Sequence, residues 1–171
     1  MKYIGPDFCN ITSLLTDEEL LIQKTANEFV AKEFLPVVNE YYEKGSFPKE
    51  LIGKMGELGF FGATLPKKYG GSEISSTAYG LIMQELEKGD SGLRSVCSVQ
   101  GGLVMYPIFE YGSEEQKEKW LPELAAGKAV GCFGLTESNH GSDPGGMTTK
   151  AVKDGDDWII NGSKMWITNG S

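Results

Sequence analysis

The sequence predicts an α+β fold in which an all-helical domain over residues 1–126 is followed by a β-rich region over residues 127–171. Apolar residues recur at helical spacing through the first three quarters of the chain, and most of these stretches begin at a capping or proline signal. From Gly127 onward the pattern changes to apolar runs rich in β-branched residues, alternation and hairpin-turn signals. These two patterns place the domain boundary near residue 127.

The first two helices have recognisable starts. Thr16 and Glu19 have the spacing of a capping box, in which each side chain bonds the other's backbone N–H. The apolar residues that follow recur at helical spacing and predict a helix that runs to about Tyr42. Ser46 and Pro48 predict the start of a second helix, because proline is tolerated in a first helical turn.

Three further helices are expected before the boundary. One covers residues 75–88, and Gly89 is expected to end it in a left-handed conformation. The next covers residues 91 to about 111. The last covers residues 113–126, with a Ser-x-x-Gln cap at its start and Trp120 on its apolar side.

The β-rich region contains three stretches of strand-forming sequence. "AVGCFGLTE" is a continuous apolar run, while "TTKAV" and "DWIINGSKMWIT" alternate or carry β-formers. "KDGDD" between the last two predicts a hairpin turn. Because two or three strands with open edges are marginally stable alone, we expect this region to be the front part of a larger sheet.

Composition limits the classes of partner and cofactor. With a net charge of −8 and a pI near 4.7, we expect no binding to nucleic acid or to an anionic membrane. No membrane span, signal peptide or transit peptide is visible, and Cys9, Cys97 and Cys132 have the pattern of unpaired thiols, so we expect a cytoplasmic protein. We expect no metal site; a metal site or a Ser-His-Asp triad built on His140, the only histidine, is the less favoured alternative.

Two segments of the β-rich region have residues suited to a cofactor. The loop over residues 132–146 is rich in Gly, Ser, Asn and Asp, so it offers free backbone N–H groups and small hydroxyls to an anionic or polar cofactor. "WIT" over residues 166–168 would suit one wall of a planar ring. The alternatives are an ordinary surface loop and an ordinary core strand. The spacing fits neither a dinucleotide-binding fingerprint nor a P-loop.

Arg94 is the only arginine among sixteen basic residues. It lies near a helix start, where a cation is unfavourable by roughly 0.3–1 kcal/mol, which calls for an explanation but does not decide its role. One interpretation is a salt bridge to Glu87, about two turns earlier. The other is bidentate binding of a ligand carboxylate, which a lysine cannot reproduce. The residues alone leave both open.

Several motifs together resemble the acyl-CoA dehydrogenase family. "FGLTE", "GSDPGGM" and "NGSKMWITNGS" resemble its flavin-contacting segments, and "LPKKYGG", "YGSEEQKEKWLPELAAG" and "GCFGLTE" follow its order and spacing. The resemblance covers the chain from about residue 13. "QELEKGDSGLRSVCSVQGGLVMYPI" is similar to the glutaryl-CoA dehydrogenases, whose substrate has a free distal carboxylate. Ser138 is a departure, because proline is common there and its absence frees the local φ angle.

The resemblance implies an architecture and a set of binding residues. The family has an N-terminal helical domain, a β-barrel-like middle domain and a C-terminal helical bundle, and this chain would contain the first domain and the first strands of the second. It implies FAD as cofactor, contacted by Phe133, Gly134, Leu135, Thr136, Ser142, Trp166, Ile167 and Thr168. It implies that Arg94 pairs with the substrate's distal carboxylate, within a substrate site made of Glu87, Arg94, Ser95, Ser98 and Ser142.

The resemblance also implies a reaction and its partners. In the family a glutamate of the C-terminal domain removes the α-proton of the thioester while the β-hydride moves to the flavin. No position here matches that glutamate, so we expect no catalytic residue in this chain and little activity from it alone. The whole protein would convert glutaryl-CoA to crotonyl-CoA, pass electrons to an electron-transfer flavoprotein and form a homotetramer. A dehydrogenase for another short-chain acyl-CoA and a non-catalytic helical binding or scaffold fragment are the alternatives.

Overall fold

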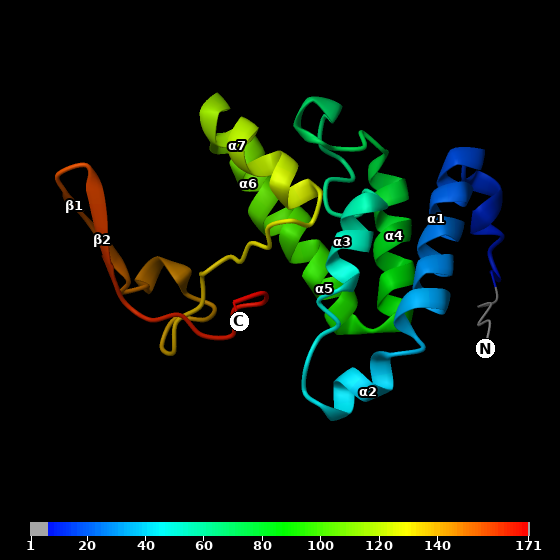
Figure 1. Cartoon of the computed structure of the whole chain (residues 1–171), viewed down its shortest axis with the longest axis horizontal. Coiled ribbons are helices and arrows are strands. Elements are labelled where there is room, and N and C mark those ends of the chain that lie inside the picture. The colour runs from blue at the N-terminus through cyan, green and yellow to red at the C-terminus, as the bar shows by residue number, and fades with distance from the viewer. Residues whose placement is uncertain (1–6, 171) are drawn as a thin grey trace.

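The computed structural model describes residues 7–170, which form a helical body and an extended arm that ends in a β-hairpin (Figure 1). The α-helices of the body are α1 Asp17–Phe29, α2 Val38–Glu43, α3 Leu51–Glu57, α4 Ser76–Gly89, α5 Ser91–Ser98, α6 Tyr106–Tyr111 and α7 Glu114–Ala125. The 3-10 helices are η1 Ile11–Leu14, η3 Lys67–Tyr69 and η5 Pro144–Gly146, and the π-helices are η2 Val30–Phe34 and η4 Val99–Met105. These elements confirm the predicted α+β class.

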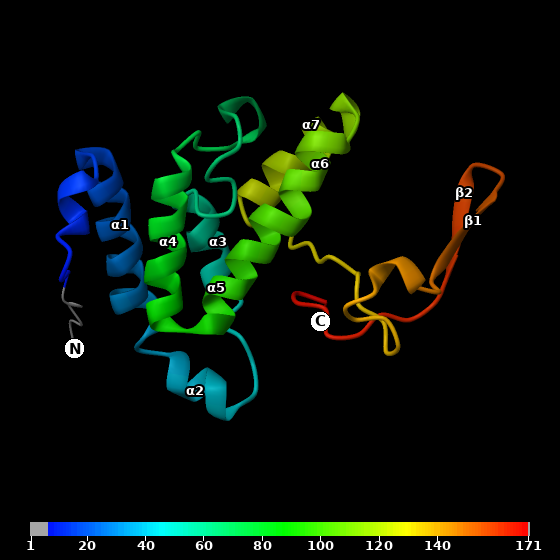
Figure 2. The ribbon, with the colours of Figure 1, turned by 180° about the vertical axis from the view of Figure 1, so that it is seen from behind.

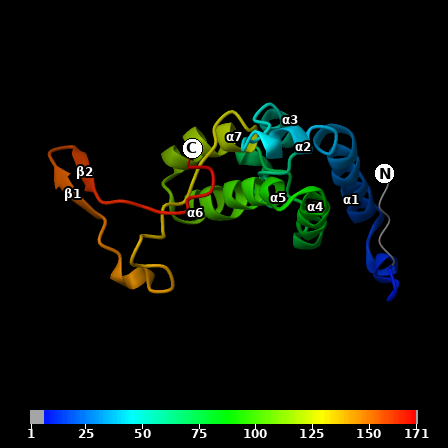
Figure 3. The same cartoon turned by 90° about the horizontal axis from the view of Figure 1, so that it is seen from below.

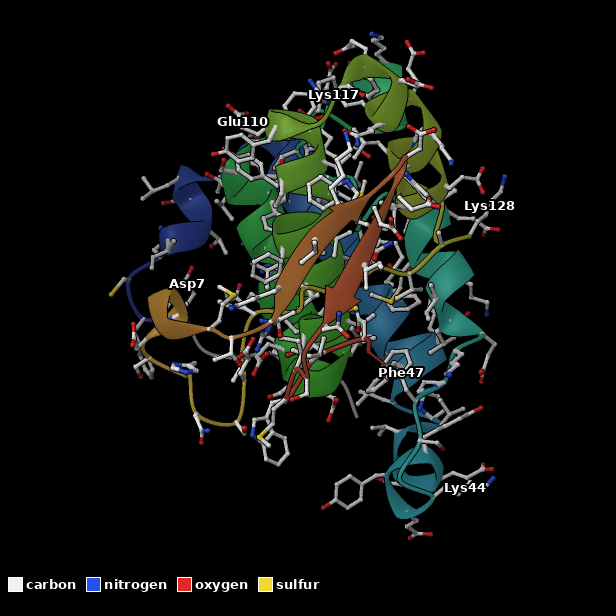
Figure 4. All side chains as sticks on the ribbon, turned by 90° about the vertical axis from the view of Figure 1, so that its left-hand side faces the viewer. Asp7, Lys44, Phe47, Glu110, Lys117 and Lys128 are labelled. Atoms are coloured by element: carbon white, nitrogen blue, oxygen red, sulfur yellow. The ribbon has the colours of Figure 1, made fainter. Side chains whose placement is uncertain are left out.

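The arm carries the only sheet among residues 7–170. Strands β1 (Lys150–Asp154) and β2 (Asp157–Asn161) pair antiparallel, with Ala151 opposite Ile160, and "KDGDD" forms the turn between them. Every residue of both strands is exposed. The hairpin stands away from the helices at the opposite end of the molecule from α1, and Figure 4 views the molecule from that end. From below, the chain beyond β2 returns toward the helices (Figure 3).

The core lies between α1, α3, α4, the run α5–η4–α6 and α7. Its fully or almost fully buried side chains include Met55, Phe60, Phe61, Ile82, Leu86, Leu93, Cys97, Met105 and Leu121. The rings of Phe29 and Phe60 meet edge to face, with centroids 5.6 Å apart. Figure 2 shows α5, η4 and α6 as one continuous helical run beside α4.

Polar contacts fix the packing of α1 on α4. The predicted capping box of Thr16 and Glu19 is present, and the Ser75 hydroxyl, which caps α4, donates to Glu19 Oε1 at 2.7 Å. Glu85 on α4 is only 2% exposed, and its carboxylate accepts hydrogen bonds from Gln23, at 3.0 Å, and Asn27, at 2.9 Å. A buried carboxylate needs such donors, and here two come from the neighbouring helix α1 and a third, Lys88 Nζ at 2.6 Å, from α4 itself.

The first predicted helix does not run to Tyr42. The helical ladder continues through η2 to Phe34 and then breaks over residues 35–37, before the separate helix α2. Pro36 lies in the break, where its missing N–H and its ring are incompatible with a continuing helix. The second predicted helix exists but begins at Leu51, three residues after Pro48.

Gly89 does not end α4 in a left-handed conformation. It is the last residue of the helix with no positive φ, and Asp90 both follows α4 and caps α5. A Cβ on Gly89 would lie 2.7 Å from Val30 Cγ1, so glycine is required there by the close approach of η2 rather than by its φ angle.

Two further predictions were wrong in detail. Trp120 is 44% exposed, and the apolar side of α7 is instead made by Leu121, Leu124 and Ala125. The "AVGCFGLTE" run is extended but forms no strand, and β2 ends at Asn161 rather than continuing through "KMWIT". Strands need a neighbour to complete their ladders, and within residues 7–170 only β1 and β2 supply one to each other. No helix in the described part of the chain is long and apolar enough to cross a bilayer.

Candidate functional site

Arg94 lies on the first turn of α5, inside a cluster of polar side chains. Its Nε donates to Glu87 Oε2 at 2.7 Å and its Nη1 donates to the Ser98 hydroxyl at 3.1 Å. The Ser91 hydroxyl donates to the other Glu87 oxygen at 2.6 Å. The predicted ion pair with Glu87 is therefore present, and Arg94 and Glu87 both remain partly exposed to solvent.

This cluster keeps its charges at neutral pH. The hydrogen bond from Arg94, followed by that from Ser91, holds the pKa of the Glu87 carboxyl below its ordinary value. Within residues 7–170, the Nη2 group of Arg94 makes no hydrogen bond. Because a guanidinium has five donors in a planar fork, Arg94 keeps capacity for a further carboxylate while it holds Glu87.

A second polar cluster holds the loop over residues 132–146. Glu137 is buried, and its carboxylate accepts four hydrogen bonds. The backbone N–H of Thr148 donates at 2.7 Å and its hydroxyl at 2.9 Å, the N–H of Thr149 at 2.9 Å, and Lys164 Nζ at 3.0 Å. Hydrogen bonding from Thr149 and Thr148, ahead of that from Lys164, holds the pKa of Glu137 well below its ordinary value.

Lys164 also brings the two predicted cofactor segments side by side. Its Nζ donates to the Leu135 carbonyl at 2.9 Å, and the next residue, Met165, donates its N–H to the Thr136 carbonyl at 2.9 Å. The residues at 133–136 and at 166–168 therefore belong to neighbouring stretches of chain, although about thirty positions separate them in the sequence.

Trp166 has an unusual backbone. Its φ is +59°, a left-handed conformation that is rare for a bulky residue, and its side chain is 87% exposed. Strained conformations of this kind cluster at ligand sites, where the surroundings fix them. Phe133, on the neighbouring stretch, is also exposed, at 42%. Two aromatic faces are thus presented to the surface beside the hydroxyl-bearing residues Thr136 and Thr168.

A cavity of about 530 Å³ has one residue of each predicted group in its wall. Its walls are Gly92, Ser95 and Val96 of α5, Thr168 and Asn169 of the returning chain, Val130, and Phe47, Lys49 and Ile52. Phe47, in the α2–α3 connection, is labelled in Figure 4. Ser95, a predicted substrate residue, and Thr168, a predicted cofactor residue, therefore line the same cavity.

Other predicted residues lie outside this cavity. Phe133, Gly134, Leu135, Thr136, Trp166 and Ile167 are not among its lining residues. Ser142 is exposed in the arm and makes no hydrogen bond within the described residues, so the structure brings it to neither cluster. Arg94, Glu87 and Ser98 lie beside Ser95 on the helices but do not line the cavity wall.

Sequence reasoning missed four residues that build the site. Glu137 and Lys164 form an ion pair, the Glu137 clasp, that fixes the loop over residues 132–146. Gln100 and Asn169 hold the chain beyond Val130 against the helices. Gln100 lies in the π-helix η4, and such helices often mark functional sites, but its sequence has no cap, proline or charge to indicate it. No local pattern indicates the role of Glu137, because its hydrogen-bond donors come from residues 11 to 27 positions away.

Comparison with known proteins identifies the family of the chain. A family model described as "Acyl-CoA dehydrogenase, N-terminal domain" matches residues 16–128, and one described as "Acyl-CoA dehydrogenase, middle domain" matches residues 132–171. Among solved structures, glutaryl-CoA dehydrogenase from Mycobacterium smegmatis is 51% identical, with a TM-score of 0.92 over 96% of this chain and 43% of that one. A glutaryl-CoA dehydrogenase of the same organism, solved in complex with FADH2, is also 51% identical, with a TM-score of 0.90 over 94% of this chain and 42% of that one.

Curated relatives include enzymes of other types. "Probable acyl-CoA dehydrogenase YngJ" of Bacillus subtilis is 43% identical over 92% of this chain and 41% of its own length. The mitochondrial short-chain specific acyl-CoA dehydrogenase of Bos taurus is 34% identical over 91% of this chain and 38% of its own length. The chain thus spans about two fifths of the length of these relatives. Because one family model alone covers more than half of the sequence, and the fold agrees with it, the chain belongs to the acyl-CoA dehydrogenase family.

Proposed function

We propose that this chain supplies the substrate-recognition helix and one wall of the flavin site of a dehydrogenase that acts on glutaryl-CoA. The observation that carries the proposal is the shared cavity, in which α5, beside Arg94, faces the segment that contains Thr168. A substrate bound there would have its distal carboxylate near Arg94 and its reacting carbons toward the cofactor segment. The high identity to two glutaryl-CoA dehydrogenases supports the same substrate class.

Arg94 would recognise the distal carboxylate. Its Nη2 group has no partner within residues 7–170, and Glu87 and Ser98 hold the rest of the guanidinium in place. A pre-positioned arginine loses little side-chain freedom on binding, and a bidentate contact to a carboxylate is directional. Glu87 would therefore act by orienting Arg94, and Ser95 would contribute a hydroxyl to the cavity wall.

The residues of the cofactor segments fit FAD. An isoalloxazine ring needs flat apolar contact on its faces and hydrogen-bond donors at its nitrogen and oxygen atoms. Trp166 and Phe133 present exposed aromatic surfaces, and Thr136 and Thr168 have hydroxyls on the same two neighbouring stretches. With Gly134, Leu135 and Ile167 these residues would hold the flavin, which supplies a hydride acceptor when it is bound.

The proton-abstracting base would come from outside residues 1–171. Glu87 is held by Arg94 and Ser91, and Glu137 by Thr148, Thr149 and Lys164, so both carboxylates have lowered pKa values and are occupied. A general base must be free to take a proton at the substrate carbon. We therefore propose that residues 1–171 alone turn over little or no glutaryl-CoA, even with FAD added.

For the whole protein, we propose that dehydrogenation is coupled to decarboxylation to give crotonyl-CoA. Electrons would pass to an electron-transfer flavoprotein, the assembly would be a homotetramer, and the location would be cytoplasmic. Product analysis, reduction of an added electron-transfer flavoprotein, the sedimentation mass and cell fractionation test these four points separately.

A second candidate is a dehydrogenase for a shorter, uncharged acyl-CoA. The supporting observation is that Glu87 already neutralises Arg94 without any ligand, as a purely structural ion pair would. The identity to short-chain relatives is consistent with it. A non-catalytic scaffold fragment is the third alternative, and a colourless protein that binds no FAD would favour it.

The deciding experiment uses the complete protein loaded with FAD and compares glutaryl-CoA with butyryl-CoA. In the proposed function, Arg94→Lys lowers kcat/KM for glutaryl-CoA by about 10- to 100-fold, the effect of losing a charge-assisted contact of about 1.5–3 kcal/mol. The same variant leaves butyryl-CoA turnover within about twofold. Equal effects on both substrates, or wild-type preference for butyryl-CoA, would rule out the carboxylate clamp.

A further inference from the structure

Two amide side chains join the arm to the helical body. Among the hydrogen bonds of residues 7–170, those between residues 131–170 and the helices are made by Gln100 and Asn169. The Gly131 N–H donates to Gln100 Oε1 at 2.9 Å. Asn169 Nδ2 donates to the Gly131 carbonyl at 3.2 Å and to the Val96 carbonyl at 3.5 Å.

Gly131 lies between these two side chains and is pressed against the helices. A Cβ at this position would lie 2.4 Å from Val104 Cγ1, so a larger residue here would have to displace the Val104 side chain of η4. The N–H of Gly131 is held by Gln100 and its carbonyl by Asn169, so both of its backbone groups are used. The chain is thus fixed at the point where it leaves the helices for the cofactor loop.

Asn169 links the two walls of the cavity directly. It follows Thr168 in the returning chain, and its second acceptor, Val96, follows Ser95 on α5. Thr168, Asn169, Ser95 and Val96 all line the cavity. One primary amide with two N–H groups therefore spans from the cofactor wall to the substrate wall.

The residue type and its backbone suit this role. Asn169 has a φ of +64°, in the left-handed region that asparagine tolerates better than most residues. Its Nδ2 has two donors for two carbonyl oxygens. An aspartate of the same shape would turn acceptor oxygens toward both carbonyls and reverse the interaction, while a glycine would keep the φ angle and remove the side chain.

We propose that Asn169 is a positioning residue that sets the spacing between α5 and the Thr168 segment, and so between the acyl chain and the flavin. The inference rests on the proposed function for the identity of the two ligands. Reacting groups must be held within a narrow range, and a misplacement of about 1 Å can lower a rate by about 100-fold. Asn169 touches no reacting atom in this arrangement and acts through the backbone that it holds.

The first test needs neither FAD nor substrate. Amide hydrogen exchange is measured on the wild-type protein, Asn169→Asp, Asn169→Gly and the control Asn161→Asp, which changes an exposed asparagine at the end of β2. We expect both Asn169 variants to exchange at least about tenfold faster at Gly131, with α1–α4 unchanged and the control equal to wild type. Wild-type exchange at Gly131 in both Asn169 variants would overturn the proposal.

The second test uses the complete, FAD-loaded protein with the same variants. We expect kcat for the acyl-CoA substrate to fall by about 10- to 100-fold in Asn169→Asp, with KM within about threefold and with a shift in the visible flavin bands. Asn169→Gly should show a smaller fall, because it introduces no repulsion. Unchanged kcat and spectrum in both variants would overturn the positioning role, whereas a wild-type protein that turns over no acyl-CoA would overturn the proposed function instead.

Discussion

Replacing Gln100 by leucine should destabilise the protein, because it removes the hydrogen bonds that hold Ala129 and Gly131, the junction between the helices and the arm. Gln100 is 0% exposed, and it makes three hydrogen bonds: Nε2 donates to the Leu124 carbonyl at 3.0 Å and the Ala129 carbonyl at 2.8 Å, and Oε1 accepts from Gly131. Leucine has a similar volume and no polar atom. The substitution therefore removes the bonds without leaving a large cavity.

The loss of stability in Gln100→Leu depends on which hydrogen bonds remain for the backbone groups that Gln100 contacts. The Leu124 carbonyl retains a bond from the Gly127 N–H at 3.2 Å, so its loss is small. The Ala129 carbonyl and the Gly131 N–H have no other partner within residues 7–170 and lie half-buried. A buried group left without a partner costs about 1–3 kcal/mol, so two half-buried groups give a loss of about 2–3 kcal/mol in the free energy of unfolding.

Urea unfolding followed by circular dichroism measures this loss. The matched control is Gln84→Leu, because Gln84 is an exposed glutamine whose side chain only accepts a long, 3.5 Å hydrogen bond from Gln23 within residues 7–170. We expect the control to stay within about 0.5 kcal/mol of wild type, as surface substitutions usually do. A loss of less than about 1 kcal/mol in Gln100→Leu would refute the argument that this amide holds the junction.

Three further outcomes are expected. Because the folded-state pKa of Glu137 lies below its unfolded value, its contribution to stability is present above about pH 4.3 and is lost as the pH falls through the folded pKa. Protection of the arm's amides, measured against their intrinsic exchange rates, should therefore persist at pH 5 and be lost in strong acid, whereas Glu137→Gln should have lost it already at pH 7. Leu121→Ala should lower the free energy of unfolding by about 2–5 kcal/mol, and Trp120→Ala by less than about 1 kcal/mol, as compared by denaturant titration. A thiol reagent should modify the exposed Cys132 rapidly and Cys97 only after unfolding, since burial raises the pKa of the Cys97 thiol and removes it from solvent; equal rates would contradict this.

The helical part of the fold was predictable because its signals are local. The cap of α1, with Thr16 and Glu19, and that of α7, with Ser113 and Gln116, depend on residues three positions apart, and both are present. The break at Pro36 was a local signal that the predicted helix to Tyr42 ignored, whereas the wrong conformation of Gly89 depends on a distant residue. The requirement for glycine at position 89 comes from the approach of Val30, nearly sixty positions earlier, and no local pattern contains that contact.

The candidate site was predictable in part for the same reason. The ion pair between Arg94 and Glu87 spans seven residues, about two helical turns, and the structure confirms it. The roles of these residues toward a substrate, and those of Trp166 and Thr168 toward a flavin, stay predictions. Gln100 and Asn169 could not have been identified from the sequence, because their hydrogen-bond partners are backbone groups that only folding brings close to them.

The candidate site is held together by two kinds of contact, one that depends on carboxylates and one that depends on amides. The Arg94 cluster and the Glu137 clasp depend on carboxylates, so both weaken once acid protonates them. The junction at Gly131 is held by amide groups, which do not titrate between pH 2 and pH 10. We therefore expect acid to loosen Arg94 and the loop over residues 132–146, while Asn169 keeps α5 and the Thr168 segment joined. If Asn169 positions the two walls as proposed, their spacing would depend on amide contacts and would not change with pH over this range.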